Sequence, residues 1–246
     1  MTTIAVQPQI KSQFNPLRLV RHSLELTKRS LIKTYRTPEA LIDVTVHQYL
    51  QFLMPGILAQ TIAMGAISIG VNLNSDLEKG IFDRFRSLPI ARSAPLIGAV
   101  LGDVVRYVIV TISTFAFAYL MGFRIDASPL HAIAGCLLAV LFGLCLSWAM
   151  VFVGMLVRTS GAVQGIGFLV MMPLTFASNV FVGTMTLPGW MQGFVKVNPL
   201  THLVESMRGL FLGTPVGNHV WWTLAWCAGF VAVFMPLALA AYRKKV

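Results

Sequence analysis

Long uncharged stretches constrain the fold of this chain more than any other feature, and they cover approximately residues 52–73, 94–122, 130–157, 162–182 and 220–241. A helix needs about 20 apolar residues, each rising 1.5 Å, to cross a hydrocarbon core of roughly 30 Å. With 56% hydrophobic and 11% charged residues, the 246-residue chain is too apolar for an ordinary soluble domain. The sequence therefore predicts an all-α, polytopic transmembrane helix bundle with five apparent spans, a multi-pass protein of the cell (plasma) membrane.

The basic residues predict which connections face the cytoplasm. There are 19 Lys and Arg against 9 Asp and Glu, and cytoplasmic loops carry the excess of basic residues in membrane proteins. The loop 74–93, the turn 158–161 and the tail 243–245 are basic, so we expect them inside. Alternation then places 123–129 and 183–219 outside. The charge points to a lipid membrane as partner, and we expect no nucleic-acid partner.

Sequence patterns for metal or nucleotide chemistry are absent. The three cysteines lie within apolar runs and the five histidines are scattered at loops and helix ends, without metal-ligand spacing. No phosphate-binding loop of the form GxxxxGK[ST] occurs in the sequence. We therefore expect no metal, no cofactor and no catalytic residue, and if ATP drives this protein, another protein supplies the ATPase.

The N-terminal segment conflicts with this topology. We expect residues 1–16 to be a disordered tail and 17–35 to form a basic amphipathic helix on the membrane surface, as part of a membrane domain 17–246. A plainer reading is a basic flank that only sets orientation. Either way the segment belongs inside, yet one crossing separates it from the inner loop 74–93, and an even number is required. The intervening 37–51 is too short and too polar to be another span.

The inner loop 74–93 has a regular pattern of apolar residues that a simple connection between two spans would not need. Its apolar residues recur at three- to four-residue spacing until Pro89 stops the pattern, and they are Ile81, Phe82, Phe85 and Leu88. A short helix with exposed aromatic residues suggests a docking surface for a soluble partner. A helix lying on the membrane surface explains the pattern equally well.

Two acid–base pairs lie at three-residue spacing, which places each pair on one helix face. They are Asp103 with Arg106, and Glu205 with Arg208. Intramembrane charges suggest function. Both pairs lie near span ends with an opposite charge in reach, so we favour structural ion pairs over a proton relay. The glycine patterns at 98–102, 161–165 and 209–213 are of the kind that allows helices to approach closely.

Three stretches resemble a known family: YLQFLMPGILAQT, NLNSDLEKGIFDRFRSLPIARSAPL, and the run from VQGIGFLVMMPL to NPLTHLVESMRGL. They are similar to the type-2 ABC exporter permeases, and most of all to daunorubicin and doxorubicin resistance permeases. The resemblance covers roughly residues 17–246. It implies six spans and a non-enzymatic permease that pairs with a second copy or a paralogue. It also implies two separate ABC ATPase subunits, which together with the permeases export drugs, lipids or glycans.

The resemblance also implies roles for particular segments. The first cytoplasmic loop of the family carries the coupling helix that docks on the ATPase. Its counterparts here are Leu77, Glu78, Lys79, Phe82, Asp83, Arg84, Phe85, Arg86, Ser87, Leu88 and Pro89. The stretch 187–213 would be a partly re-entrant outer segment.

A departure from the family explains the conflict in topology. Similar permeases carry an additional apolar helix between the positions of 43–46 and 49–52, whereas this sequence runs almost directly from one to the other. The first transmembrane helix is therefore expected to be missing. The resemblance predicts the permease subunit of an exporter. The alternative is a truncated, non-transporting subunit that docks the ATPase as an assembly or decoy protein.

Overall fold

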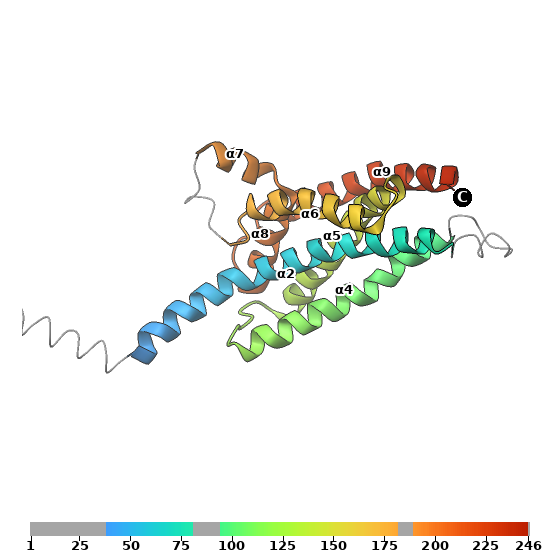
Figure 1. Cartoon of the computed structure of the whole chain (residues 1–246). Helices are drawn as coiled ribbons and strands as arrows, with labels where there is room; N and C mark the ends of the chain where they lie inside the picture. The colour runs from blue at the N-terminus through green and yellow to red at the C-terminus, as the bar shows by residue number, and fades with distance from the viewer. Residues whose placement is uncertain (1–37, 81–93, 182–188, 246) are drawn as a thin grey trace, which may run out of the picture. The chain divides into compact units, whose positions relative to one another are not determined.

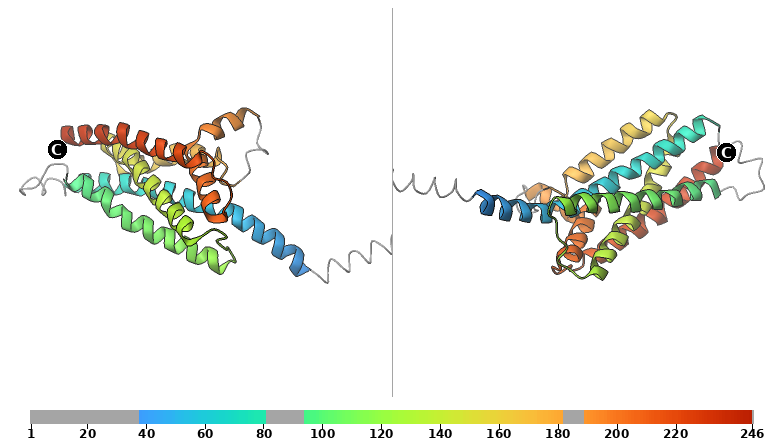
Figure 2. Two further views of the ribbon diagram at one scale, coloured as in Figure 1. Left: turned by 180° about the vertical axis from the view of Figure 1, so that it is seen from behind. Right: turned by 90° about the horizontal axis from the view of Figure 1, so that it is seen from below.

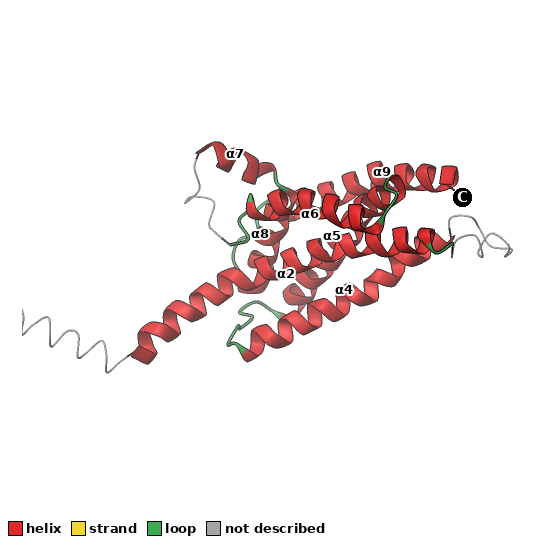
Figure 3. Cartoon of the chain, viewed as in Figure 1, coloured by secondary structure: helices red, strands yellow, loops and turns green. Residues whose placement is uncertain are grey.

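The computed structural model of the chain describes residues 38–80, 94–181 and 189–245. All elements within these ranges are α-helices, which confirms the all-α prediction (Figure 3). The chain divides into two compact units, Met1–Val46 and His47–Val246, and the second holds the helix bundle. The predicted disordered tail 1–16 and the predicted surface helix 17–35 lie outside the described residues.

Four predicted spans are confirmed as long apolar helices. They are α2 (Pro38–Glu78), α4 (Ala94–Leu120), α5 (Pro129–Leu156) and α9 (His219–Lys245). The segments long and apolar enough to cross a membrane are Tyr49–Glu78, Ile97–Leu120, Pro129–Leu156 and His219–Tyr242. Their apolar side chains face outward along much of α4 and α9, as expected for helices in contact with lipid.

The fifth predicted span, 162–182, is wrong at its C-terminal end. The helix α6 is Ser160–Phe176, and its 17 residues extend about 25 Å, less than the roughly 30 Å of a hydrocarbon core. Two contacts stabilise the early end: Asn198 Nδ2 donates to the carbonyls of Leu174 and Ala177 at 2.7 and 2.8 Å. The apolar run in the sequence continues beyond the point where these bonds end the helix.

Helix α5 is the centre of the bundle. It packs against α4, α6, α8 (Pro199–Leu212) and α9, and Figure 2 shows it between α4 and α9. Phe142, Leu146 and Val151 of α5 are almost completely buried. The short α7 (Gly189–Val197) precedes α8, and both are labelled in Figure 1.

Local signals fix several helix ends. Asn198 caps α8 by accepting from the Leu200 amide at 2.9 Å, and Pro199 occupies the first helical turn, where no amide donor is needed. Gly213 ends α8 with φ of 70°, a left-handed conformation that glycine adopts without a Cβ penalty. Thr159 caps α6 by accepting from the Ala162 amide at 3.4 Å.

A close backbone approach joins α2 and α5. A Cβ on Gly154 would lie 2.7 Å from the Gly70 carbonyl oxygen, and a Cβ on Gly70 would lie 2.5 Å from the Met150 carbonyl oxygen. The sequence patterns at 98–102 and 161–165 do not mark such contacts within the described chain. A Cβ at any of the four glycines that bound those patterns would have no neighbour within 4 Å.

Hydrogen bonds group the connections into two ends of the bundle. At one end, Asn74 Nδ2 donates to the Val157 carbonyl at 2.9 Å. At the other end, Gln51 Nε2 donates to Asp126 Oδ2 at 3.4 Å, and the Asp126 amide donates to the Phe211 carbonyl at 3.1 Å. This grouping matches the predicted alternation, which assigns residues 74–93 and 158–161 to the inner end. The orientation of these ends in the membrane stays a prediction.

Candidate functional site

The predicted coupling region begins where α2 ends. Glu78 and Lys79 are exposed, whereas Leu77 packs against the buried core. Gly80 follows with φ of 66°, a conformation that terminates a helix readily. The remaining predicted coupling residues, from Phe82 to Pro89, lie outside the described residues.

The inner end of α2 is held to the turn between α5 and α6. The Asn74 side chain is buried, and its Nδ2 donates to the carbonyls of Gly154 at 2.8 Å and Val157 at 2.9 Å. One turn later, Glu78 Oε1 accepts from the Ser160 amide at 3.3 Å. Glu78 belongs to the predicted ATPase-docking segment, so this connection includes the start of that segment.

Asp103 and Arg106 lie deeper in the bundle than their sequence positions predicted. Arg106 Nη2 donates to the Gly65 carbonyl of α2 at 2.7 Å, and Gly65 is near the middle of the apolar segment Tyr49–Glu78. The same nitrogen lies 3.2 Å from Asp103 Oδ2, an ion-pair distance, while that oxygen has no hydrogen-bond partner in the described part of the chain. The prediction that this pair lies near a span end is therefore wrong. That its role is structural stays a prediction.

Arg208 joins three segments at the outer end. Its Nε donates to the Phe52 carbonyl at 3.1 Å, and its Nη2 donates to the carbonyls of Asn179 and Val180 at 2.8 and 3.3 Å. Its guanidinium carbon lies 3.6 Å from the centroid of the Phe52 ring. We call Arg208 with these partners and Glu205 the outer clamp.

The two charged side chains of the outer clamp differ in their exposure to solvent. The Arg208 side chain is only 8% exposed, whereas the Glu205 side chain is 36% exposed, and their ion-pair distance is 3.3 Å. Burial lowers the pKa of Arg208 from its ordinary value, and the Glu205 carboxylate opposes this shift. Asn179 Nδ2 also donates to Glu205 Oε1. Arg208 therefore depends mostly on backbone carbonyls, a set of partners that the three-residue spacing could not predict.

Two histidines meet beside the outer clamp. His202 Nδ1 lies 3.0 Å from His219 Nδ1, and Trp222 stacks on the His202 ring with centroids 5.7 Å apart. Burial lowers the pKa of His202, and the nearby His219 lowers it further. Among the residues that the structure describes, no three His, Cys, Asp or Glu side chains gather as metal ligands would.

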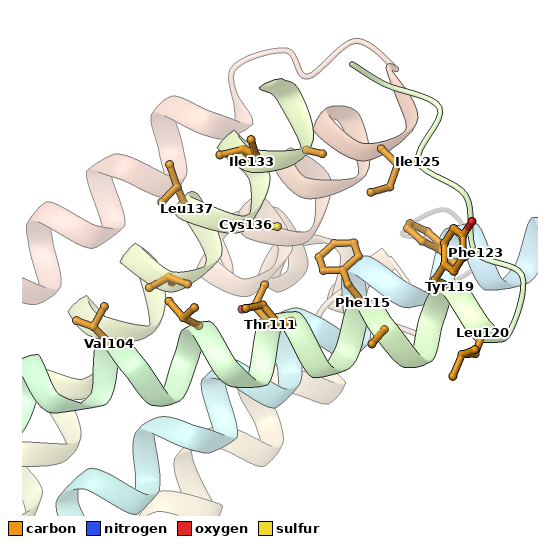
Figure 4. Close-up of a pocket in the computed structure, with 15 residues that line it drawn as sticks. Val104, Thr111, Phe115, Tyr119, Leu120, Phe123, Ile125, Ile133, Cys136 and Leu137 are labelled. Carbon is orange, nitrogen blue, oxygen red and sulfur yellow. The ribbon is translucent and has the colours of Figure 1, made fainter. Parts of the chain in front are cut away.

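Two apolar grooves lie on the helix bundle. One of about 900 Å³ lies between α4 and α5, and Figure 4 shows the side chains that line it. Thr111 and Tyr119 supply its hydroxyl groups among otherwise apolar residues. A second of about 480 Å³ is lined by aromatic residues that include Phe152, Phe194 and Trp226. Both are of the size and chemistry that receive apolar ligands or lipid chains.

Sequence reasoning missed the asparagines that fasten helix ends. Asn74 and Asn198 each donate two hydrogen bonds to the last carbonyls of a neighbouring helix. An amide side chain at the end of an apolar run is the signal that could have indicated them, because a buried amide needs partners.

The fold and these sites define a polytopic helical membrane protein whose long helices expose many apolar side chains. The family model described as ABC-2 type transporter matches residues 23–212. The chain therefore belongs to the ABC-2 type transporter family.

Several relatives carry names that describe drug resistance. The chain is 40% identical over 215 residues to the daunorubicin resistance ABC transporter permease protein DrrB1 of Streptomyces coeruleorubidus, covering 87% of this chain and 76% of that protein. It is 25% identical over 202 residues to a probable doxorubicin resistance ABC transporter permease protein of Mycobacterium tuberculosis, covering 82% and 72% of the two chains. It is also 27% identical over 176 residues to the inner membrane transport permease YadH of Escherichia coli, covering 70% and 66%.

Proposed function

We propose that this chain is the transmembrane permease subunit of an ATP-driven exporter that moves amphiphilic drugs or lipids out of the cell. The observation that carries the proposal is the 40% identity to a daunorubicin resistance permease over 87% of the chain. A separate ABC ATPase, in two copies, supplies the hydrolysis of ATP. The chain itself is not an enzyme.

The inner end of the bundle supports docking of that ATPase. The segment from Leu77 to Pro89 begins in the last turn of α2, and Asn74 and Glu78 hold that end of the helix to the rest of the bundle. A rigid attachment transmits force, whereas a flexible linker would absorb it. Closure of the ATPase dimer would press on this segment and tilt the spans toward an outward-open arrangement.

A polar face on α2 supports a second permease copy. Thr61, Ser68 and Asn72 are exposed on the apolar segment Tyr49–Glu78. Polar side chains within a span rarely face lipid and usually face a protein neighbour or an aqueous path. A second copy of this chain or a paralogue would cover this face and enclose the path.

The grooves support an amphiphilic substrate. A volume of about 900 Å³ with almost exclusively apolar lining can receive the rings of an aromatic drug or the chain of a lipid. Daunorubicin is the appropriate first probe because its fluorescence reports accumulation in cells.

The test is efflux of daunorubicin from cells that express this chain together with its ATPase. We expect lower drug accumulation than in cells that express either protein alone, and no reduction when the ATPase cannot hydrolyse ATP. Accumulation that is unchanged by co-expression would contradict export of this class of compound. Replacing daunorubicin with a fluorescent phospholipid in the same cells separates drug export from lipid export.

One observation favours the second candidate, a non-transporting subunit that docks the ATPase. The helix α2 is uninterrupted from Pro38 to Glu78, across the region in which the family resemblance implies an additional span. A chain without that span could bind the ATPase and fail to enclose a path. Recovery of the ATPase with the membranes, combined with absence of efflux for drug and lipid probes, would favour this candidate.

A further inference from the structure

Asn74 and Glu78 stand one turn apart on one face of α2 and contact both helices that meet at the next inner turn. Asn74 Nδ2 lies 2.8 Å from the Gly154 carbonyl and 2.9 Å from the Val157 carbonyl, at the end of α5. Glu78 Oε1 lies 3.3 Å from the Ser160 amide, at the beginning of α6. The side chain of Asn74 is buried, and the residue is 1% exposed.

The chemistry of these contacts matches the needs of the two helix ends. The last carbonyls of a helix lack amide donors, and the first amides lack carbonyl acceptors. An amide group supplies donors to the end of α5, and a carboxylate supplies an acceptor and a negative charge to the start of α6. The last turns of α2 therefore cap two other helices at once.

The same face of α2 also holds the backbone contact with α5. Gly70 precedes Asn74 by four residues, and its carbonyl oxygen would lie 2.7 Å from a Cβ on Gly154. Positions 70, 74 and 78 follow one another at four-residue spacing on one face of α2. The backbone contact of Gly70 and the hydrogen bonds of Asn74 and Glu78 therefore form one continuous interface along this face. Packed backbone without space for a methyl group leaves little room for sliding.

We infer that Asn74 and Glu78 form a rigid inner joint, through which movement of the coupling region is passed to the turn between α5 and α6. Glu78 is itself one of the predicted coupling residues, and the rest of the coupling region follows it directly in the sequence. A push on that region therefore moves the end of α2 together with the ends of α5 and α6, as one body. The inference rests on the proposed function, and both residues act as positioning residues.

The first test is Asn74→Asp, which retains the size of the side chain and removes both donors when it is ionised and one donor when it is protonated. We expect the ATPase to stay bound and to hydrolyse ATP, while daunorubicin export per ATP in everted vesicles falls by about tenfold. Gln164→Glu is the matched control, because Gln164 is exposed and undergoes the same change from amide to carboxylate. Normal export per ATP in Asn74→Asp would overturn the inference. So would a loss of export that only follows a loss of folded protein.

The second test replaces the hydrogen bonds with a covalent link. Asn74→Cys and Val157→Cys are combined in a chain from which Cys136, Cys145 and Cys227 have been removed, and are joined by a short reversible bis-methanethiosulfonate reagent. We expect weak export before cross-linking and export within about twofold of the cysteine-free chain afterwards, because a rigid joint does not need to open. Export that is abolished by the link, or is normal without it, would overturn the inference.

The rate of this cross-linking provides a measurement that needs no substrate. A rigid joint predicts the same rate without nucleotide and with ATP plus vanadate, which traps the ATPase. A rate that changes with nucleotide would show that the joint opens and would overturn the inference. If the cysteine-free chain exports no daunorubicin with its ATPase, the proposed function fails, whereas the cross-linking rate still decides the inference about the joint.

Discussion

Arg208 contributes more to this fold than its acidic neighbour does. Its side chain donates to carbonyls on α2 and on the turn after α6. A buried donor that is removed leaves its partners unsatisfied, and breaking a buried ion pair costs about 3–5 kcal/mol. The partial exposure of Glu205 lets water replace its contacts.

We therefore expect the two residues of the ion pair in the outer clamp to differ in their importance for folding. Arg208→Ala should reduce the yield of folded protein severely, whereas Glu205→Ala should have a mild effect, measured as monodisperse protein after extraction in detergent. Exchanging the two charges should not restore the yield, because the three carbonyls require a donor at position 208. Equal losses from both alanine variants, with recovery upon exchange, would show that the ion pair itself dominates.

The histidine pair predicts a dependence of stability on pH. Burial and His219 lower the pKa of His202, so the unfolded chain binds a proton at higher pH than the folded chain does. The stabilising contribution of neutral His202 to the folded state is fully present above the pKa of histidine in the unfolded chain, about 6.5. It is lost as the pH falls through the lower pKa that His202 has in the folded chain. The melting temperature of the purified chain should decrease from neutral to mildly acidic pH. His202→Gln should flatten this part of the profile, and a slope unchanged by that substitution would assign the effect to other groups.

At the scale of single residues, sequence reasoning recognised charges and overlooked amides. Three-residue spacing indicated which charges could meet, since that distance follows from helix geometry. It could not indicate that Arg106 reaches Gly65 or that Arg208 reaches Phe52, because those partners come from distant parts of the chain.

At the scale of elements, helix contacts are set by glycines that the sequence patterns did not mark. Gly154→Ala should lower the melting temperature, because the added methyl group would lie 2.7 Å from the Gly70 carbonyl oxygen. Gly165→Ala is the control, because a methyl group there has no neighbour within 4 Å. Alanine also favours a helix over glycine by about 1 kcal/mol, so the control should be neutral or stabilising. A similar loss in both variants would show that the crossing at Gly70 is not a tight contact.

The coupling region yields a prediction that rests on its sequence. Reversal of charge in Arg84→Glu with Arg86→Glu should abolish recovery of the ATPase with the membranes while the chain still inserts, as measured by co-purification. Arg124→Glu serves as the comparison, since Arg124 lies at the opposite end and stacks on Tyr119 with 4.6 Å from its guanidinium carbon to the ring centroid. Undiminished recovery of the ATPase would remove the docking role from this loop.

Sequence periodicity located the helices but not all of their ends. Apolar length predicted α2, α4, α5 and α9, since crossing a membrane requires a long uncharged run. The end of α6 at Phe176 depends on Asn198, which lies more than twenty residues later in the chain. An apolar run cannot reveal an end that is fixed by a distant residue.

At the scale of the whole molecule, the number of crossings connects topology with function. The hydrogen bonds of Gln51 and Asn74 belong to opposite ends of the bundle, so one crossing separates them. If the loop 81–93 is cytoplasmic, as docking of an ATPase requires, the chain before Gln51 begins on the outer side. Seven basic residues at positions 11–36 oppose this arrangement by the charge rule. We expect the N-terminus to be translocated nevertheless, because the segment Tyr49–Glu78 is apolar enough to insert.

If a cytoplasmic ATPase drives this bundle from its inner end, the loop 81–93 must face the cytoplasm, and single-cysteine labelling measures on which side it lies. Ser12→Cys and Ser87→Cys are placed separately in a chain without the three native cysteines, and an impermeant thiol reagent is added to intact cells. We expect Ser87→Cys to react only after the membrane is opened, whereas Ser12→Cys reacts from outside. Reaction of Ser87→Cys in intact cells would contradict docking of a cytoplasmic ATPase on this loop, because the ATPase could not then reach it.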